Sequence, residues 1–156
     1  CLSTRGQMFW IDEDHTGCIQ PGKRPRITLS PSLVLRDDEP YMAFGTPGGD
    51  QQDQWPLQMF LRHVHHGMNL QAAIDAPNFH STHFPGSFYP REWDPAGLRM
   101  EARFGDDTMD TLERLGHRIY AEDDWSLGRV SACARDGDLL KAAANPRFMQ
   151  GYAAGR

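Results

Sequence analysis

The sequence has few of the features that mark a metal-binding, membrane-spanning or nucleic-acid-binding protein. Its three cysteines, Cys1, Cys18 and Cys133, lack the spacing of a metal site, and their odd number does not suggest a disulfide framework. No apolar run approaches the ~20 residues that a membrane-spanning helix needs. The net charge of −5 argues against a nucleic-acid partner, because phosphate binding requires a basic surface. No signal peptide is visible, and the sequence leaves the compartment open.

The chain also lacks internal repeats, low-complexity tracts and any linker that would divide it. With 156 residues and 39% hydrophobic residues, it is long enough for one domain with an apolar core. We therefore expect residues 1–156 to form a single domain of mixed α/β class. Its apolar strands need a partner layer that this chain does not wholly supply, so we expect the domain to be incomplete.

The most informative segment present is GTPGGD, residues 45–50. Its adjacent glycines, Gly48 and Gly49, lie between an apolar run and a helical pattern. Glycine permits a sharp turn and a close approach to a substrate, and a helix start supplies unpaired N–H groups. Such donors can form an oxyanion hole, which stabilises a developing negative charge. A plain strand-to-helix turn is the alternative interpretation.

Alternating apolar residues predict two hairpins. The first has strands at 32–35 and 41–44 around a polar turn. The second has strands at 129–134 and 138–143 around the turn Asp136-Gly137.

Helical spacing predicts three helices and one long loop. The helices are expected over 51–66, over 70–76, and from a cap at Asp106 or Asp107 to Leu115. The stretch 77–95 has no clear period and is expected to be a surface loop.

Three histidines, His63, His65 and His66, occur together near the end of the first predicted helix. Neighbouring residues on a helix point to different faces, so this spacing does not suit a metal site. We interpret the cluster as a polar helix end, and no metal or organic cofactor is implied by the sequence.

Seven short motifs carry a resemblance to a known family. They are PGKRP, TLSPSLV, GTPGGD, GMNLQAAI, APNFH, LGH and NPRF, in this order. Their order and spacing resemble the small-subunit portion of γ-glutamyltranspeptidases over nearly all of the chain. The resemblance implies an N-terminal-nucleophile hydrolase, with an αββα sandwich of which this chain is part. It also implies autoproteolysis that exposes a threonine upstream of this chain, and cleavage of γ-glutamyl amides through an acyl-enzyme on that threonine.

The same resemblance implies the partners. They are the remainder of the processed protein, namely the large subunit and the N-terminal part of the small subunit, and a small-molecule amide substrate. An N-terminal cysteine could act as a self-contained nucleophile, which makes Cys1 a candidate. However, residues 1–6 resemble a buried strand of the family and not its autocleavage point, so Cys1 is not our prediction.

The substrate-binding positions differ from the family pattern. The family has two adjacent serines that hold the α-carboxylate, and this chain has Ile27 and Thr28. Gln7 and Met8 stand where the family has acids that bind the α-amino group, and Arg5 is new. Because an arginine attracts a carboxylate and repels an ammonium, a glutaryl-like amide is a candidate substrate. This pattern resembles a branch that includes glutaryl-cephalosporin acylase-like proteins; a buried structural ion pair is the alternative role for Arg5.

Two functions from different classes follow. The first is an amidohydrolase or transferase in which Gly48 and Gly49 form the oxyanion hole, with Arg5, Thr28 and Ile27 at the acyl group. The second is a catalytically silent homologue that acts as a binding or structural module. The residue at the upstream processing site distinguishes them, because only an enzyme needs a nucleophile there. If the chain belongs to such an enzyme, the 156 residues alone are expected to be inactive, because the nucleophile lies upstream.

Overall fold

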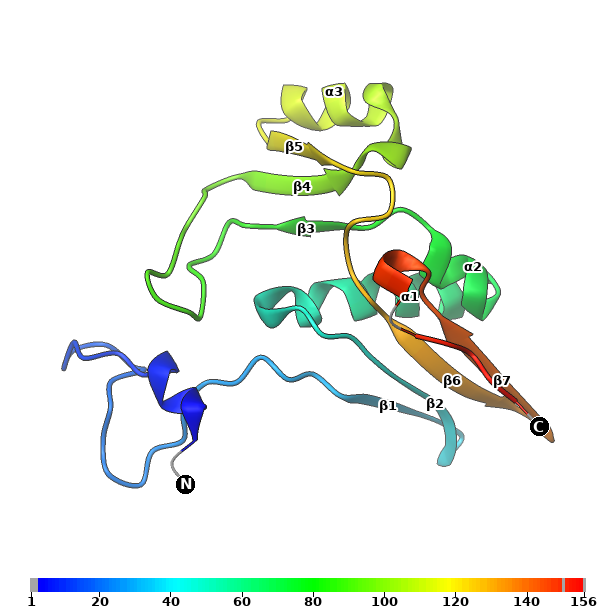
Figure 1. Ribbon diagram of the computed structural model, residues 1–156, viewed down its shortest axis with the longest axis horizontal. Helices are drawn as coiled ribbons and strands as arrows, with labels where there is room; N and C mark the ends of the chain where they lie inside the picture. Colours follow the sequence, from blue (N-terminus) through cyan, green and yellow to red (C-terminus); the bar gives the residue numbers. More distant parts are fainter. Residues whose placement is uncertain (1–2, 150, 156) are drawn as a thin grey trace.

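The chain forms two separate β-sheets, joined by helices and long connections. The computed structural model describes residues 3–149 and 151–155. One sheet has four strands in the order β1-β2-β6-β7, and the other has three in the order β3-β4-β5. Figure 1 shows the smaller sheet with α3 at one end of the molecule, and the N-terminal segment apart from the four-stranded sheet. The helices within the described residues do not have the length and hydrophobicity that a lipid bilayer requires of a spanning segment.

The two predicted hairpins are present, and they pair with each other to form the four-stranded sheet. The strands are β1 (Ser32–Arg36), β2 (Glu39–Gly45), β6 (Ser131–Asp136) and β7 (Leu139–Ala144), and all neighbouring pairs are antiparallel. The sheet therefore brings two hairpins together that lie far apart in the sequence.

The tight turns explain why the sequence indicated these hairpins so clearly. Asp37 and Asp38 both have positive φ angles, 54° and 63°, as a two-residue hairpin turn requires. Gly137 occupies the same region at 60°. Aspartate and glycine tolerate this conformation better than other residues.

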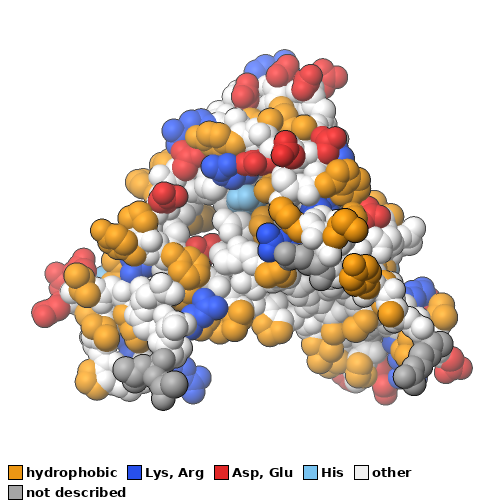
Figure 2. All heavy atoms as spheres, viewed as in Figure 1, with side chains coloured by type: hydrophobic (Ala, Val, Ile, Leu, Met, Phe, Trp, Pro, Cys, Tyr) orange, Lys and Arg blue, Asp and Glu red, His pale blue; other side chains and the backbone are white. Residues whose placement is uncertain are grey.

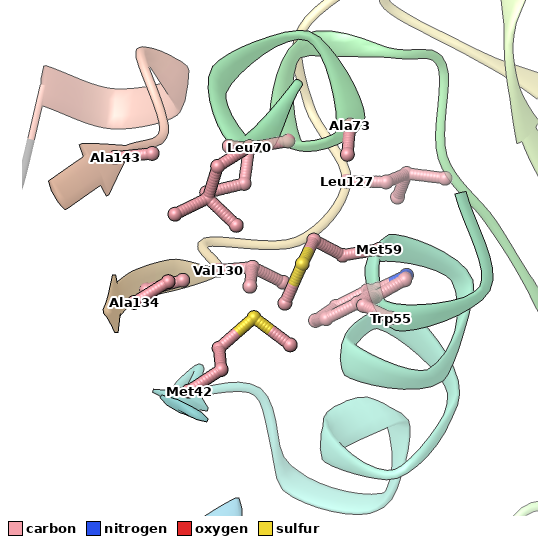
Figure 3. Close-up of a cluster of buried hydrophobic side chains, with 11 residues drawn as sticks. Met42, Trp55, Met59, Leu70, Ala73, Leu127, Val130, Ala134 and Ala143 are labelled. Carbon is pink, nitrogen blue, oxygen red and sulfur yellow. The ribbon is translucent and has the colours of Figure 1, made fainter. Parts of the chain in front are cut away.

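Two helices cover one face of this sheet. They are α1 (Gln54–Val64) and α2 (Leu70–Asp75). Met42 and Met59 are 2% and 1% exposed, and they meet beside Trp55 in the core between the sheet and α1 (Figure 3). Burial of such side chains contributes about 1.5–3 kcal/mol each. This core makes the sheet and the two helices one packed unit.

The predicted helix over 51–66 is correct in type but begins later. A separate 3-10 turn, η2 (Gly49–Gln52), precedes α1. Pro56 has no N–H and cannot donate to the carbonyl of Gln52, so the α-helical ladder cannot extend back through that bond. The Gly48–Gly49 turn is consequently followed by a short 3-10 turn and not directly by the long helix.

The opposite face of the sheet is apolar and largely uncovered. Pairing places Leu33, Ala43, Cys133 and Ala142 in one row across the four strands, so their side chains share a face. Leu33 is 68% exposed, and within the described residues the groove on this face is lined by the strands of the sheet and by residues 153–155. Figure 2 shows hydrophobic side chains at the surface over these hairpins.

The three-stranded unit was largely missed by sequence reasoning. It contains β3 (Phe79–Ser81), β4 (Gly97–Glu101) and β5 (Arg118–Glu122), and α3 (Asp106–Arg114) connects the parallel pair β4–β5. The prediction of an unbroken loop over 77–95 is wrong, because β3 begins within it. That strand has only three residues, which is too few to show an alternating pattern.

The start of α3 also differs from the prediction. Gly105 is the N-cap residue, with φ 80°, and Asp106 and Asp107 lie in the first turn without a side-chain capping bond. Their negative charges there still interact favourably with the helix dipole. The helix ends as predicted before Gly116, which has φ 99°.

Residues 3–6 do not form the predicted buried strand, so that prediction is wrong for the described part of the segment. Residues Thr4–Met8 form a 3-10 helix, η1, whose cap Ser3 accepts a hydrogen bond from the N–H of Arg5 (3.2 Å). Local side-chain capping of this kind competes with strand pairing. Cys1 lies outside the described residues.

A buried ion pair joins the two sheets. Glu101 at the end of β4 has a side chain that is 0% exposed, and Arg147, which follows β7, binds it through two bonds of 2.6 and 2.8 Å. Burial alone would raise the pKa of Glu101. Hydrogen bonds from Arg147 and from the N–H groups of Leu127 and Asn78 outweigh that effect and lower the pKa.

The remaining guanidinium hydrogens of Arg147 reach α2. They donate to the carbonyls of Ile74 and Ala76 at 2.9 and 3.0 Å. Arg103 also pairs with Glu101 at 2.7 Å, so the buried carboxylate and the guanidinium of Arg147 are both hydrogen-bonded, which is the condition under which a buried pair is tolerated. The NPRF motif of the sequence thus supplies the residue that holds the two sheets together.

Candidate active site

The Gly48–Gly49 turn lies between the end of β2 and η2. Gly48 has φ 143° and ψ 21°, and Gly49 has φ 62°, so both adopt conformations that favour glycine. A β-carbon on Gly48 would overlap the ring of Trp55, whereas one on Gly49 would make an ordinary contact of 3.5 Å with Phe88. The turn is therefore shaped by packing at Gly48 and by backbone conformation at Gly49.

The two amide groups of this turn differ in their hydrogen bonding. The side chain of Gln52, oriented so that its NH₂ donates to the carbonyl of Thr46 (2.8 Å), accepts from the Gly49 N–H at 3.2 Å. Among the described residues, no acceptor binds the Gly48 N–H. Gly48 is also exposed, so its N–H is the more accessible donor for a substrate oxygen.

The structure brings Arg5 and Thr28 together. The Nη1 of Arg5 donates to the Oγ1 of Thr28 at 3.3 Å, and Thr28 is 7% exposed. Ile27, the third predicted residue, is 55% exposed and has no polar atom in its side chain. Within the described residues no carboxylate lies within 4.0 Å of Arg5, so the alternative of an ion pair finds no partner there.

An ion pair links this segment to the glycine turn. Arg26, two residues before Thr28, lies 3.7 Å from the carboxylate of Asp50, which directly follows Gly49. The predicted acyl-binding residues and the predicted oxyanion turn therefore belong to neighbouring segments.

Sequence reasoning missed the residues that hold these segments in place. Asp50 accepts hydrogen bonds from the N–H of Ser87 (2.8 Å) and from its hydroxyl. Arg91 donates to the carbonyls of Ser87 and Phe9, both at 2.8 Å. These contacts join positions up to 82 residues apart, and no local pattern in a loop without periodicity could indicate them.

The histidines have structural surroundings. The ring of His63 hydrogen-bonds the hydroxyl of Tyr41 and the carbonyl of Met68, both at 2.8 Å. His80 is buried against the ring of Trp55, 5.3 Å between centroids, and burial lowers its pKa to about 4, with a smaller contribution from the cation of Arg99. No group of three His, Cys, Asp or Glu residues in the described ranges is placed to hold a metal ion.

Comparison with curated proteins gives two similar relatives. The chain is 32% identical to the glutathione hydrolase-like YwrD proenzyme of Bacillus subtilis, covering 94% of this chain and 27% of the relative. It is 33% identical to the oxamate amidohydrolase proenzyme of Klebsiella pneumoniae, covering 97% of this chain and 28% of the relative. The chain thus spans little more than a quarter of each relative.

Solved structures show the same fold. LmbA2991HD superimposes with a TM-score of 0.91 at 53% identity, over 99% of this chain and 28% of that one. The cephalosporin acylase of Bacillus halodurans does so with a TM-score of 0.82 at 31% identity, over 96% of this chain and 26% of that one. The predicted N-terminal-nucleophile hydrolase fold is therefore confirmed.

The sequence model of a single family matches residues 2–155, which is almost the whole chain. The matched range includes the glycine turn and the NPRF segment of this chain. The chain belongs to the gamma-glutamyltranspeptidase family.

Proposed function

We propose that this chain is the C-terminal part of the small subunit of an autoprocessed amidohydrolase that prefers monoamides of dicarboxylic acids. The observation that carries the proposal is the contact between Arg5 and Thr28, and the Arg26–Asp50 ion pair joins the Thr28 segment to the glycine turn. Gln7 and Met8, where the resemblance places acids, offer no negative charge for an α-amino group. An arginine with a free guanidinium face is suited to a carboxylate.

The reaction proceeds through an acyl-enzyme on a threonine upstream of this chain. The threonine hydroxyl attacks the amide carbon, and the threonine's own amine takes the hydroxyl proton. The carbonyl oxygen becomes negative and accepts a hydrogen bond from the Gly48 N–H. The C–N bond then breaks, and the leaving amine takes up the proton. Water hydrolyses the ester to release the dicarboxylic acid; an amine acceptor in its place gives transfer.

The Gly49 N–H is the second donor of the oxyanion hole. Gln52 holds it at 3.2 Å in the absence of substrate. A charge-assisted hydrogen bond to an oxyanion is roughly twice as strong as a neutral one, so the oxyanion competes effectively for this donor. Gln52 thereby keeps the peptide oriented until negative charge develops.

The names of two similar proteins support the substrate class. Oxamate, the substrate in the name of the Klebsiella relative, is the monoamide of a dicarboxylic acid. Cephalosporin acylase, one of the similar structures, is named for the removal or transfer of an acyl group. Neither name requires an α-amino group on the acyl side.

The rest of the protein covers the apolar face of the four-stranded sheet. That face carries the row Leu33, Ala43, Cys133 and Ala142 and borders a groove of about 720 Å³. An exposed apolar face of this kind marks an interface. The chain spans about a quarter of its curated relatives, so most of the protein is available to form the second layer. In this arrangement residues 1–156 contribute one domain to a larger assembly.

The test is the mass of the small subunit during turnover. Full-length protein is mixed with glutaryl-p-nitroanilide, quenched within the first turnover and examined by intact mass and N-terminal sequencing. We expect a small subunit that begins with threonine and carries one glutaryl group. An unprocessed protein, or one without an adduct, would instead support the catalytically silent module. The 156 residues alone should form no adduct.

A further inference from the structure

Phe88 is an aromatic side chain placed directly beside the oxyanion turn. Its ring carbon Cε2 lies 3.5 Å from the position that a β-carbon on Gly49 would occupy. The side chain is not part of either hydrophobic core, and Phe88 is 38% exposed. The ring therefore has one part against Gly49 and another part open to solvent.

The loop that carries Phe88 is anchored on both sides of the site. Ser87 donates to Asp50 through its N–H and its hydroxyl, which fixes the residue before Phe88 to the residue after Gly49. On the other side Arg91 donates to the carbonyl of Phe9 (2.8 Å) and stacks over Trp10 at 4.1 Å. Figure 1 shows this loop reaching from the three-stranded unit toward the N-terminal segment.

The loop also closes on itself, so Phe88 is held and not left on a free end. Gly86 donates its N–H to the carbonyl of Glu92 at 2.9 Å, and Arg91 donates to the carbonyl of Phe88 at 2.6 Å. An exposed aromatic side chain on a closed turn loses little conformational freedom when it binds a ligand, because few bonds remain to be ordered.

We propose that Phe88 is a specificity-determining residue that contacts the amine side of the substrate and favours an aromatic leaving group. This inference rests on the proposed function. Arg5 and Thr28 belong to the acyl side, whereas Phe88 comes from another segment and adjoins the turn that receives the carbonyl oxygen. An aromatic ring beside a reacting carbonyl can stack on a flat group bonded to that carbonyl. Ser87 and Asp50 are positioning residues for the ring.

The test compares two amides that share one acyl group. Full-length protein is given glutaryl-p-nitroanilide or glutaryl-N-methylamide, and glutarate release is measured for both. Because both substrates carry the same glutaryl group, the ratio of the two kcat/KM values, anilide over methylamide, measures selectivity for the amine part of the substrate alone. An aromatic contact of this type corresponds to about 2- to 12-fold, so Phe88→Ala should lower the ratio by that factor. Phe88→Tyr should preserve it.

Phe84 supplies the matched control. It belongs to the same loop, is 79% exposed and packs on His83, away from the glycine turn. Phe84→Ala should leave the ratio unchanged, and Ser87→Ala should lower it less than Phe88→Ala does. A mere loss of folded protein would reduce both kcat/KM values equally and would not change the ratio.

Each outcome has a defined meaning. An active protein whose ratio is the same in wild type and folded Phe88→Ala overturns this inference and leaves the proposed function standing. Equal changes in Phe84→Ala and Phe88→Ala overturn it as well. A wild-type protein that releases glutarate from neither amide contradicts the proposed function itself, and the inference fails with it.

Discussion

Two regions of this molecule are held together in different ways. Between the four-stranded sheet and its two helices, the contacts are apolar and buried, with Met42 and Met59 at the centre. Around the glycine turn, three irregular segments meet through a few polar contacts, such as those of Ser87 with Asp50 and of Arg91 with Phe9. The first region determines the fold. Side chains in the second region can be substituted, and the chemistry of the site altered, with little loss of folding stability.

The difference predicts that changes in the two regions have separate readouts. Substitutions in the packed region should lower stability, and substitutions around the turn should lower turnover or alter selectivity. Loops generally carry function on a rigid scaffold for this reason. All the variants described below are made in the full-length protein. A packed-region variant that lost only turnover, or a turn variant that lost only stability, would contradict this difference.

The largest expected effect is at the junction between the sheets. Glu101→Gln leaves the buried guanidinium of Arg147 without its counter-charge, so the free energy of unfolding should fall by about 3–5 kcal/mol. The half-exposed pair Arg99–Glu122 supplies the control, and Glu122→Gln should cost only about 0–1 kcal/mol. Denaturant unfolding measures both. Equal losses of unfolding free energy in the two variants would show that burial does not make the Glu101–Arg147 pair more important for stability than a surface pair.

The next effect is on turnover and not on stability. Gly49→Ala forces the backbone away from φ 62° and misdirects its N–H, so kcat should fall by about 10²- to 10³-fold. Gly137→Ala is the matched control, because Gly137 has φ 60° in a hairpin turn and open space around it. Both variants should lose a similar, small amount of stability, and only the first should lose turnover.

Gly48→Ala would be less informative, because the new β-carbon overlaps the ring of Trp55 in the core. That variant should lose stability and turnover together. Normal turnover in folded Gly49→Ala protein would remove the oxyanion role from this residue.

The third effect is a pH dependence that arises in the packed region. Burial holds the pKa of His80 near 4, below its ordinary 6.5, so the unfolded chain binds a proton that the folded chain does not. The free energy of unfolding is therefore highest above pH 6.5. It falls by up to about 3 kcal/mol as the pH falls toward 4, because protonation of His80 then stabilises the unfolded chain.

His80→Gln should flatten the stability curve between these pH values, and His117→Gln at an exposed position should not. Unfolding measured across the pH range compares them. An unchanged slope in His80→Gln would show that His80 is not the titrating group.

A smaller effect is expected at the acyl-binding contact. Arg5→Gln removes a charged donor to the substrate carboxylate, which is worth about 10- to 150-fold in kcat/KM for a glutaryl amide. Arg24→Gln, at an exposed position four residues before Thr28, should have no such effect. Similar losses in both variants would indicate a general dependence on positive charge and not a specific contact.

The same division explains what the sequence could reveal. The two hairpins and the helices α1 and α2 were predictable, because alternation, helical spacing and turn residues such as Asp37-Asp38 are local signals. The short strand β3 was not, because three residues show no period and its pairing partner lies about 20 residues away.

The site was predictable only in part. Gly48 and Gly49 carry a local signal, since adjacent glycines mark a turn. The roles of Asp50, Ser87 and Arg91 depend on contacts between distant segments, which no window of the sequence contains. The prediction of a buried strand was wrong for residues 3–6, because Ser3 caps a 3-10 helix there.

We propose that the full-length protein does not require an α-amino group beside the carboxylate of its substrate. The most direct measurement is kcat/KM of the full-length protein for glutaryl-p-nitroanilide and for γ-glutamyl-p-nitroanilide, which differ only in that amino group. With Gln7 and Met8 near Arg5, the account predicts that the glutaryl compound is processed at least as well. A preference for the γ-glutamyl compound by orders of magnitude would contradict it.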